Sequence, residues 1–420
     1  MGFLRAFCLA VSLLLLAAPT YAQTSEAGKT APVRLRVFID CQYQCDVDYL
    51  RQNIEFIDYV RDRATSDVDV LVTTEGTGGG GMSWNLNFIG RDYFMGRNQL
   101  LKFTTPQTFT DDDRRREFAR VFKVGLVGYA AQTSVASDLD VAYKKAEAEK
   151  ASKVVVRDPW KYWVFRGGFD FNGNGEQSSS NGSYHVNFSG NRTTNEWKIN
   201  VFLNADTNLS RFNLSDGEVV KSNTNGWNMN SLVVKSWGPK WSYGARTSIS
   251  HSSFSNNDRA VGAYPAIEYD IFPYSESTQR RLTIQYAIGA THYRYSELTI
   301  FDKLQETVPN HSLSTSLGLR APWGSLSGSV NISQHLNHLS RYHLSLFTNT
   351  DIRIFKGFSF NINGGYDKIG DQIGLRKGEV SEQAALLKLQ QQASGYSYFF
   401  YGGFSYSFGS IFNSIVNSRF

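Results

Sequence analysis

The chain has 420 residues, with 43 basic and 38 acidic side chains, and its net charge of +5 is too small to indicate a nucleic-acid-binding protein. Aromatic residues make up 14% of the chain, yet the mean hydropathy is −0.33. Beyond the N-terminus there is no run of about 18 apolar residues, which excludes an α-helical membrane protein. With 36 glycines, the composition favours a mainly β protein, including one that crosses a membrane with alternating strands.

The first residues have the composition of a secretory signal peptide. Arg5 supplies the positive charge, residues 9–18 form the apolar stretch, and Thr20-Tyr21-Ala22 ends in the small residue that a signal peptidase reads. We therefore expect residues 1–22 to be removed and the mature chain to enter the periplasm.

Residues 23–135 predict a periplasmic α/β domain in the order β-α-β-β-β-α. The glycine-rich segment 75–81 lies between two of its strands. A phosphate-binding loop would need Gly-Lys-Ser/Thr at the start of a helix, so this segment predicts a hairpin tip. Residues 136–159 predict a charged helical connector. The expected strands are 33–39, 68–74, 82–89 and 100–109, and the expected helices are 46–63 and 111–131.

Cys41 and Cys45 are the cysteines of the expected mature chain. Their Cys-x-x-x-Cys spacing differs from the redox-active Cys-x-x-Cys motif, and zinc would require two further ligands that no nearby histidine supplies. In an oxidising periplasm the pair predicts a structural disulfide. We expect no metal and no cofactor.

From Trp160 to Phe408 the hydrophobic period changes to two. Trp163, Phe165 and Phe169 alternate with polar or small residues, and serine, asparagine and glycine fill the intervening positions of later segments. Short connections alternate with longer ones at 174–182, 206–225, 296–310 and 367–395. This pattern predicts an antiparallel transmembrane β-barrel of about twelve strands over residues 160–408, followed by a tail at 409–420. The expected strand starts are near 162, 183, 196, 227, 241, 260, 281, 312, 325, 341, 358 and 396.

An even number of strands places both termini on one side, which the signal peptide and the N-terminal domain make the periplasm. Charged side chains between the apolar positions are then predicted to face the lumen. They form either the selectivity lining of a pore or a salt-bridged plug. The segment 379–392 has helical spacing and predicts an amphipathic helix at the mouth. The lumen-facing set is Arg166, Asp170, His185, Lys198, Asp206, Arg246, Glu268 and Asp351.

The last predicted strand contains Gly403, Tyr406 and Phe408. This pattern resembles the C-terminal targeting signal of Gram-negative outer-membrane β-barrels, which implies insertion by the barrel assembly machinery. The tail departs from that family, because the chain ends in a second aromatic residue, Phe420. The segment Gly173-Asn174-Gly175-Glu176 and the serine-rich strand after it are similar to the first hairpin of stress-induced outer-membrane barrels.

His251-Ser252-Ser253 resembles the outward His-x-Ser of outer-membrane phospholipases, which implies a lipid hydrolase using His251 and Ser253. That family carries an asparagine on the next strand, but the corresponding segment here, Ala260–Asp270, has none. We therefore expect a polar strand end at the lipid headgroups and no enzymatic activity.

These patterns together predict an outer-membrane protein that acts as a narrow pore, a transporter or an organiser of the envelope. Its expected partners are outer-membrane lipids, the barrel assembly machinery, and a periplasmic protein or peptidoglycan. Two alternatives remain open: a lipid hydrolase, and a periplasmic binding module that the barrel anchors.

Overall fold

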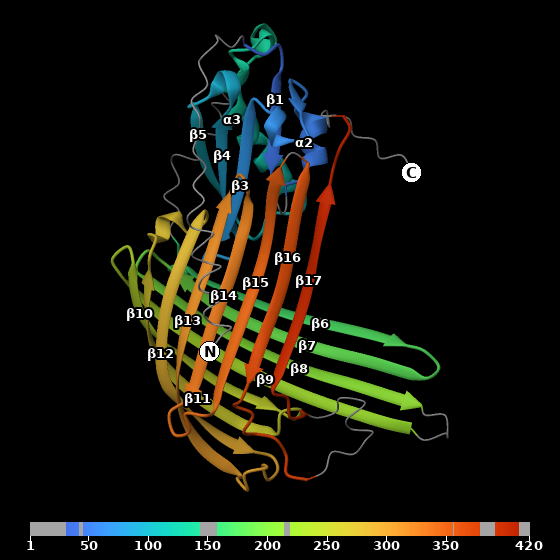
Figure 1. Ribbon diagram of the computed structural model, residues 1–420, viewed down its shortest axis with the longest axis vertical. Helices are drawn as coiled ribbons and strands as arrows, with labels where there is room; N and C mark the ends of the chain where they lie inside the picture. Colours follow the sequence, from blue (N-terminus) through green and yellow to red (C-terminus); the bar gives the residue numbers. More distant parts are fainter. Residues whose placement is uncertain are drawn as a thin grey trace.

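The computed structural model describes residues 31–41, 45–142, 158–213, 219–355, 357–378 and 391–410. The described chain forms a mixed five-stranded sheet with two α-helices, followed by a twelve-stranded antiparallel sheet. Figure 1 shows the small N-terminal domain at one end of the long strands β13–β17. None of the helices in the described ranges is long and apolar enough to span a membrane.

The N-terminal domain is a sheet in the order β2-β1-β3-β4-β5, parallel from β2 to β3 and antiparallel from β3 to β5. Its core contains Val37, Val70 and Trp84 from the strands together with Phe118 and Phe122 from α3. The elements are β1 Leu35–Asp40, α2 Val47–Asn53, β2 Ile57–Tyr59, β3 Val68–Gly76, β4 Met82–Gly90, β5 Asn98–Thr105 and α3 Asp111–Ala130.

Helix α3 begins with a capping box. The Thr110 hydroxyl accepts a hydrogen bond from the Asp113 amide at 3.1 Å, and the Asp113 carboxylate accepts one from the Thr110 amide, also at 3.1 Å. The buried residues Phe118, Phe122 and Leu126 then follow at four-residue intervals and face the sheet. The helix therefore lies within one residue of its expected bounds.

The expected helix over 46–63 is wrong in its second half. Helix α2 ends at Asn53, because Ile54 adopts a non-helical conformation with φ −134° and ψ 87°. Ile57 and Tyr59 then pair with β1 as the edge strand β2 and are buried on alternate positions. The expected helix relied on the three-residue spacing of Ile57 and Val60, whereas the two-residue spacing of Ile57 and Tyr59 fits a strand. Pairing with β1 decided the outcome. Strand β5 also ends earlier than expected, at Thr105, because Pro106 has no amide hydrogen for the ladder.

The long sheet runs in sequence order from β6 to β17, and every neighbouring pair is antiparallel. Its strands are β6 Trp163–Gly175, β7 Ser179–Thr193, β8 Trp197–Asn213, β9 Val219–Trp237, β10 Trp241–Ser252, β11 Asn257–Asp270, β12 Arg280–Tyr295, β13 Gln305–Ala321, β14 Gly324–His335, β15 Tyr342–Phe355, β16 Phe358–Ile369 and β17 Tyr396–Tyr406.

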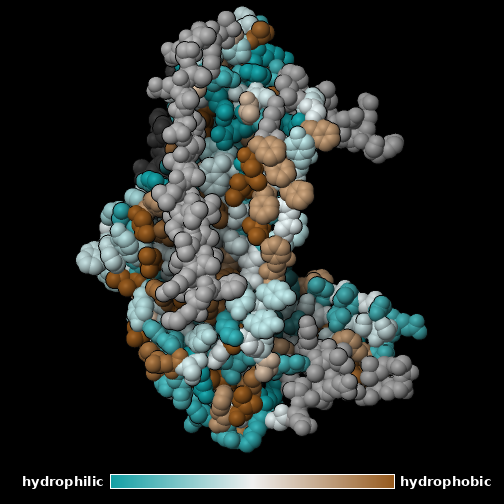
Figure 2. Space-filling model, viewed as in Figure 1, coloured by the Kyte–Doolittle hydropathy of each residue, from teal (hydrophilic) through white to brown (hydrophobic). Residues whose placement is uncertain are grey.

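The two faces of this sheet differ in polarity. One row across five neighbouring strands consists of apolar side chains that are 40% to 48% exposed, and we call this side the apolar face. The adjacent row, one residue away in each strand, is polar, and we call this side the polar face. Figure 2 shows apolar side chains gathered along β16 and β17 as well. The apolar row is Tyr243, Ile267, Tyr286, Leu313 and Ile332, and the polar row is Glu268, Gln285, Ser314, Asn331, Ser345 and Asp367.

Several strands extend into segments that were expected to be long connections. Strand β7 starts at Ser179, β8 continues to Asn213, and β13 starts at Gln305. These extensions are mostly polar, with isolated apolar residues such as Leu209 and Val308, so regular hydrophobic alternation does not reveal them, although their backbones still pair. In Figure 1 the strands β6–β9 run at a steep angle to β13–β17, so the sheet is strongly curled. Within the described ranges, β6 and β17 are the two ends of the sheet, and no ladder joins them.

Some expectations lie outside the described residues. These are the signal peptide at 1–22, most of the connector at 136–159, nearly all of the amphipathic segment at 379–392, and Phe420. The first residues of the connector belong to a short 3-10 helix, Ser134–Asp138.

Candidate functional site at the junction of domain and sheet

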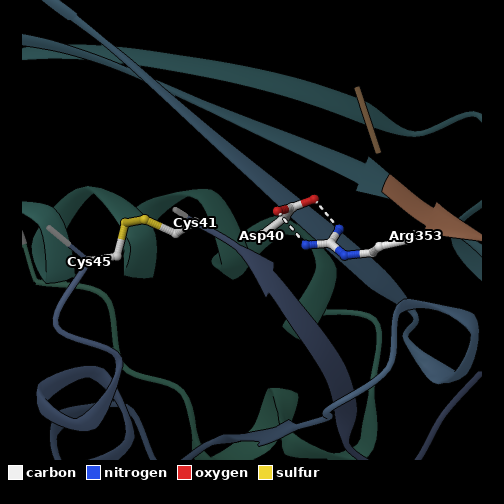
Figure 3. Close-up of a disulfide and its surroundings, with 4 residues drawn as sticks. All are labelled: Asp40, Cys41, Cys45 and Arg353. Carbon is white, nitrogen blue, oxygen red and sulfur yellow. Dashed lines mark hydrogen bonds and ion pairs between the residues drawn. A yellow bond between two sulfur atoms is a disulfide. The ribbon is translucent and has the colours of Figure 1, made fainter. Parts of the chain in front are cut away.

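The N-terminal domain contacts the near ends of the long sheet at several separate strands. Ser277, between β11 and β12, donates to a Glu75 carboxylate oxygen at 3.1 Å. The Arg61 guanidinium donates to the carbonyl oxygen of Phe408, just after β17, at 2.6 Å. A third contact, between Asp40 and Arg353, is drawn in Figure 3. The domain therefore contacts the rim of the sheet near β12, β15 and β17, which agrees with its position in Figure 1.

Asp40 is the last residue of β1, and Arg353 lies near the end of β15. Arg353 Nη2 donates to Asp40 Oδ1 at 2.8 Å, and Arg353 Nη1 donates to Asp40 Oδ2, which makes a two-pronged ion pair. The Arg353 guanidinium also lies over the Phe38 ring, 5.2 Å from its centroid. Asp40 is 6% exposed. Loss of Arg353 would leave the buried Asp40 carboxylate without its counterion.

The disulfide lies next to this ion pair. Cys41 follows Asp40 directly and is bonded to Cys45, just before α2 (Figure 3). The bond therefore links the end of β1, which carries Asp40, to the start of α2. This is the pairing that the sequence predicts.

The glycine-rich tip of the β3–β4 hairpin, residues 77–81, reaches the rim next to β7. Hydrogen bonds from the Thr77 amide to the Gly81 carbonyl (2.9 Å) and from the Gly80 amide to the Thr77 carbonyl (3.0 Å) hold the turn. A Cβ atom on Gly78 would lie 2.2 Å from the Cβ of Thr193. Only glycine allows this approach, so the segment is a hairpin tip, as expected, and it also serves as a docking element.

A cavity of about 620 Å³ lies between β3 and the polar face of the sheet. Its wall includes Glu75 from the domain, Arg281 and Arg320 from β12 and β13, and Asp351 from β15. The hydroxyl of Thr73, which also lines it, is buried and has no hydrogen-bond partner within the described residues. The cavity is thus a polar vestibule at the end of the polar face.

The strand register places all the residues predicted to face the lumen on the polar face. Asp170 lies opposite His185, which in turn lies opposite Asp206. The Glu268 carboxylate accepts a hydrogen bond from Gln285 at 3.0 Å. Among the described residues no ion pair joins two members of this set. At the end of the sheet next to the N-terminal domain, the ion pair is formed between the domain and the sheet, by Asp40 and Arg353. The sequence did not predict this pair, because Asp40 lies in the α/β segment and Arg353 in the segment of alternating strands.

A buried carboxylate lies close to the Asp40–Arg353 pair. Asp69 on β3 is fully buried, and its Oδ2 lies 3.0 Å from Arg63 Nε. Burial removes water from the carboxylate and raises the pKa of Asp69 to about 6, an effect that Arg63 partly offsets. Asp40 raises this pKa further and Arg353 lowers it, so the charges of the domain and the rim are electrostatically coupled.

His251 and Ser253 do not form a catalytic pair in this structure. His251 Nδ1 lies 2.9 Å from the Asp258 carbonyl, which only accepts, and His251 Nε2 lies 3.0 Å from Asn225 Oδ1. Ser253 is in the turn after β10, where its hydroxyl accepts from the Asn225 amide at 2.8 Å and donates to the Asn225 carbonyl at 3.1 Å. Both ring nitrogens are occupied, and the serine extends the β9–β10 pairing.

The asparagine beside His251 comes from the preceding strand, β9, and not from the next one. The sequence prediction placed this partner after His251 in the chain, whereas Asn225 lies before it. Among the described residues, no group of three or more histidine, cysteine, aspartate or glutamate side chains is placed to hold a metal ion.

No family model matches the chain, and no curated protein matches it. Two solved structures show a distant likeness. One is a NanC porin in a rhombohedral crystal form, with a TM-score of 0.29 and 9% identity, covering 58% of this chain and 99% of the porin. The other is CdiB from Acinetobacter baumannii, with a TM-score of 0.26 and 10% identity, covering 81% of this chain and 71% of CdiB. A likeness at these scores does not indicate a function for this chain.

Proposed function

We propose that the protein is an outer-membrane β-barrel whose polar face lines a solute path and whose N-terminal domain closes the periplasmic mouth. The observation that carries the proposal is the pair of adjacent rows across the long sheet, one apolar and exposed, the other polar. A sheet with this polarity is suited to lipid on one side and water on the other.

Energetics support the membrane location. Each large apolar side chain gains about 1.5–3 kcal/mol when it leaves water for an apolar phase, so a belt of such residues favours the bilayer strongly. Open strand edges are costly in hydrocarbon, because backbone groups there find no water. In the membrane we therefore expect β6 and β17 to pair and close the barrel.

The contacts at the rim support a closing role for the domain. The contacts described above are polar and are distributed around the rim. Contacts of this kind suit a domain that can detach from the rim better than one that is packed permanently against it. The Asp40–Arg353 pair is the contact whose loss should release the cover most readily, because it is buried and bidentate. Solute movement, without chemistry, is the activity proposed.

Planar-bilayer conductance of the full chain tests this function. The wild type should be mostly closed, and Arg353→Gln should raise the open probability. Arg280→Gln is the matched control, because Arg280 pairs with Glu276 on its own side of the junction. A Glu75→Cys/Ser277→Cys pair should lock the channel closed when oxidised and release it on reduction. A wild type as open as Arg353→Gln, or no current from any variant, would refute the gated-pore function.

A further inference from the structure

The segment that follows β16 folds across the end of the sheet opposite the N-terminal domain. We call residues 370–378 the strap. The Asn256 side chain donates to the Gly374 carbonyl at 3.0 Å, and the Ile300 amide donates to the Leu375 carbonyl at 2.9 Å. An isolated antiparallel bridge joins Arg376 to Thr299. The strap therefore connects the end of β16 to the β10–β11 and β12–β13 connections, several strands away.

The strap also carries its own charged and apolar anchors. Arg376 Nε donates to Glu297 at 2.9 Å, and Arg376 Nη2 donates to the Ser253 carbonyl at 2.6 Å. Ile373 and Leu375 are 6% and 8% exposed. A cavity of about 310 Å³ lies beneath the strap, so the strap has the geometry of a lid.

His343 on β15 lies between two carboxylates, one on the sheet and one on the strap. Its Nε2 lies 3.2 Å from Asp367 Oδ1 on β16, and its Nδ1 lies 3.3 Å from Asp371 Oδ1 on the strap. A neutral imidazole carries one N–H, so one of these contacts would set a lone pair against a carboxylate. The imidazolium donates to both. The imidazolium is therefore the form of the ring that satisfies both contacts at once.

The other charged groups near His343 do not provide a substitute for this link. On β13, Glu306 is already paired with Lys303 at 2.6 Å and accepts from the Tyr295 hydroxyl at 2.9 Å. Arg341 lies over the Phe301 ring, 4.2 Å from its centroid. His335 on β14 is buried, and its Nδ1 has no hydrogen-bond partner among the described residues. The remaining neighbours in the cavity wall, Tyr293 and Tyr295, are neutral phenols.

We propose that His343 is a proton-operated latch that holds the strap closed when the imidazole is protonated and loosens it when the imidazole is neutral. Imidazole is the side chain that ordinarily changes charge between about pH 5 and 8. The latch lies at the mouth opposite the N-terminal domain, so it is separate from the closure by the Asp40–Arg353 pair. Its test does not require the protein to conduct current.

Accessibility of the buried strap residue Leu375 tests the latch. In the expected mature chain Cys41 and Cys45 are joined in a disulfide, so Leu375→Cys supplies the free thiol for labelling. Its labelling by a water-soluble maleimide reports the open fraction of the strap. Leu339→Cys, 62% exposed in the β14–β15 loop, is the reference that corrects for the pH dependence of the thiol reaction. After this correction, labelling at pH 5 should be about five-fold slower than at pH 8, the factor expected for one partly exposed ion pair.

Two further variants separate the latch from a general effect of pH. His343→Gln should label at the faster rate at both pH values, whereas His311→Gln, whose side chain lies on the apolar face, should keep the wild-type difference. Asp371→Asn should behave like His343→Gln. Equal corrected rates at pH 5 and pH 8 in the parent protein, or a pH difference that persists in His343→Gln, would overturn the proposal.

Discussion

Asp40 and Arg353 are 313 residues apart in the chain, yet the Arg353 guanidinium donates to both carboxylate oxygens of Asp40. This ion pair fixes the end of β1 to the end of β15. Asp67 and Arg36, by contrast, form a comparable pair within the N-terminal domain, with Nη2 and Oδ1 2.6 Å apart. The Asp40–Arg353 pair therefore links the two sheets, whereas the Asp67–Arg36 pair joins the residue before β3 to β1 within one sheet.

The first prediction concerns the coupling of Asp40 and Arg353. Asp40→Asn and Arg353→Gln should each weaken docking of the domain by about 2–3 kcal/mol. This is less than the roughly 3–5 kcal/mol for a fully buried pair, because Arg353 is one-third exposed. The double variant should cost little more than either single change. Maleimide labelling of Thr73→Cys, a buried position at the junction, measures undocking. Additive effects would show that the two residues act independently.

The second prediction concerns the glycine tip. Gly78→Ala should undock the hairpin, because the new methyl group would overlap Thr193. Gly76→Ala is the control on the same hairpin, since nothing lies within 4 Å of its Cβ position. The same labelling of Thr73→Cys should therefore accelerate only for Gly78→Ala. Equal rates for the two variants would remove the tip from the docking surface.

The third prediction concerns pH and Asp69. Its folded pKa, about 6, exceeds the unfolded value of about 3.9, so its stabilising contribution is fully present below pH 4 and is lost as pH rises through 6. Relative to Asp69→Asn, the wild-type domain should lose about 3 kcal/mol between pH 4 and 7, since each pKa unit corresponds to 1.36 kcal/mol. Hydrogen exchange of β3 and β4 amides in urea measures this difference.

The exposed Asp138 provides the matched control for this measurement. Asp138→Asn should keep the wild-type dependence on pH. A difference between wild type and Asp69→Asn that stays constant from pH 4 to 7 would contradict the raised pKa.

The fourth prediction concerns His251 and Ser253. Because both ring nitrogens are occupied, we expect no phospholipid hydrolysis by the purified protein with or without calcium. Ser253→Ala removes two hydrogen bonds in a turn and should cost about 1 kcal/mol of stability. A detergent-phase lipase assay beside thermal unfolding checks both points. Calcium-stimulated hydrolysis that disappears in Ser253→Ala would establish the lipid hydrolase instead.

The fifth prediction concerns assembly. Phe408 is 78% exposed just after β17, and Phe408→Ser should sharply reduce the heat-modifiable, urea-resistant protein in outer-membrane fractions. Met95→Ser, equally exposed but in the N-terminal domain, should have no effect. Phe420→Ser identifies which aromatic residue the assembly machinery reads. Normal insertion of Phe408→Ser with loss in Phe420→Ser would assign the signal to the chain end.

The sequence alone determined the twelve strands, their order and their polar face. Alternation with period two repeats along most of the strands, and a one-residue shift would move Tyr243 and its neighbours to the wrong face. It also predicted α3, because Thr110 and Asp113 form a local cap. These features depend on residues close together in the chain, where spacing and geometry are directly related.

Only the tertiary structure decided the rest. Ile57 and Val60 fit one face of a helix, but residues 57–59 pair with the edge of β1 and form a strand. Asn225, on the strand before that of His251, contacts the His251 ring, and Asp40 pairs with Arg353 across the junction between the two sheets. His343 gained its second carboxylate only because the strap folds back over the sheet. Each of these contacts depends on how whole elements pack. The residues around a side chain in the sequence do not indicate which distant residue will contact it in the folded protein.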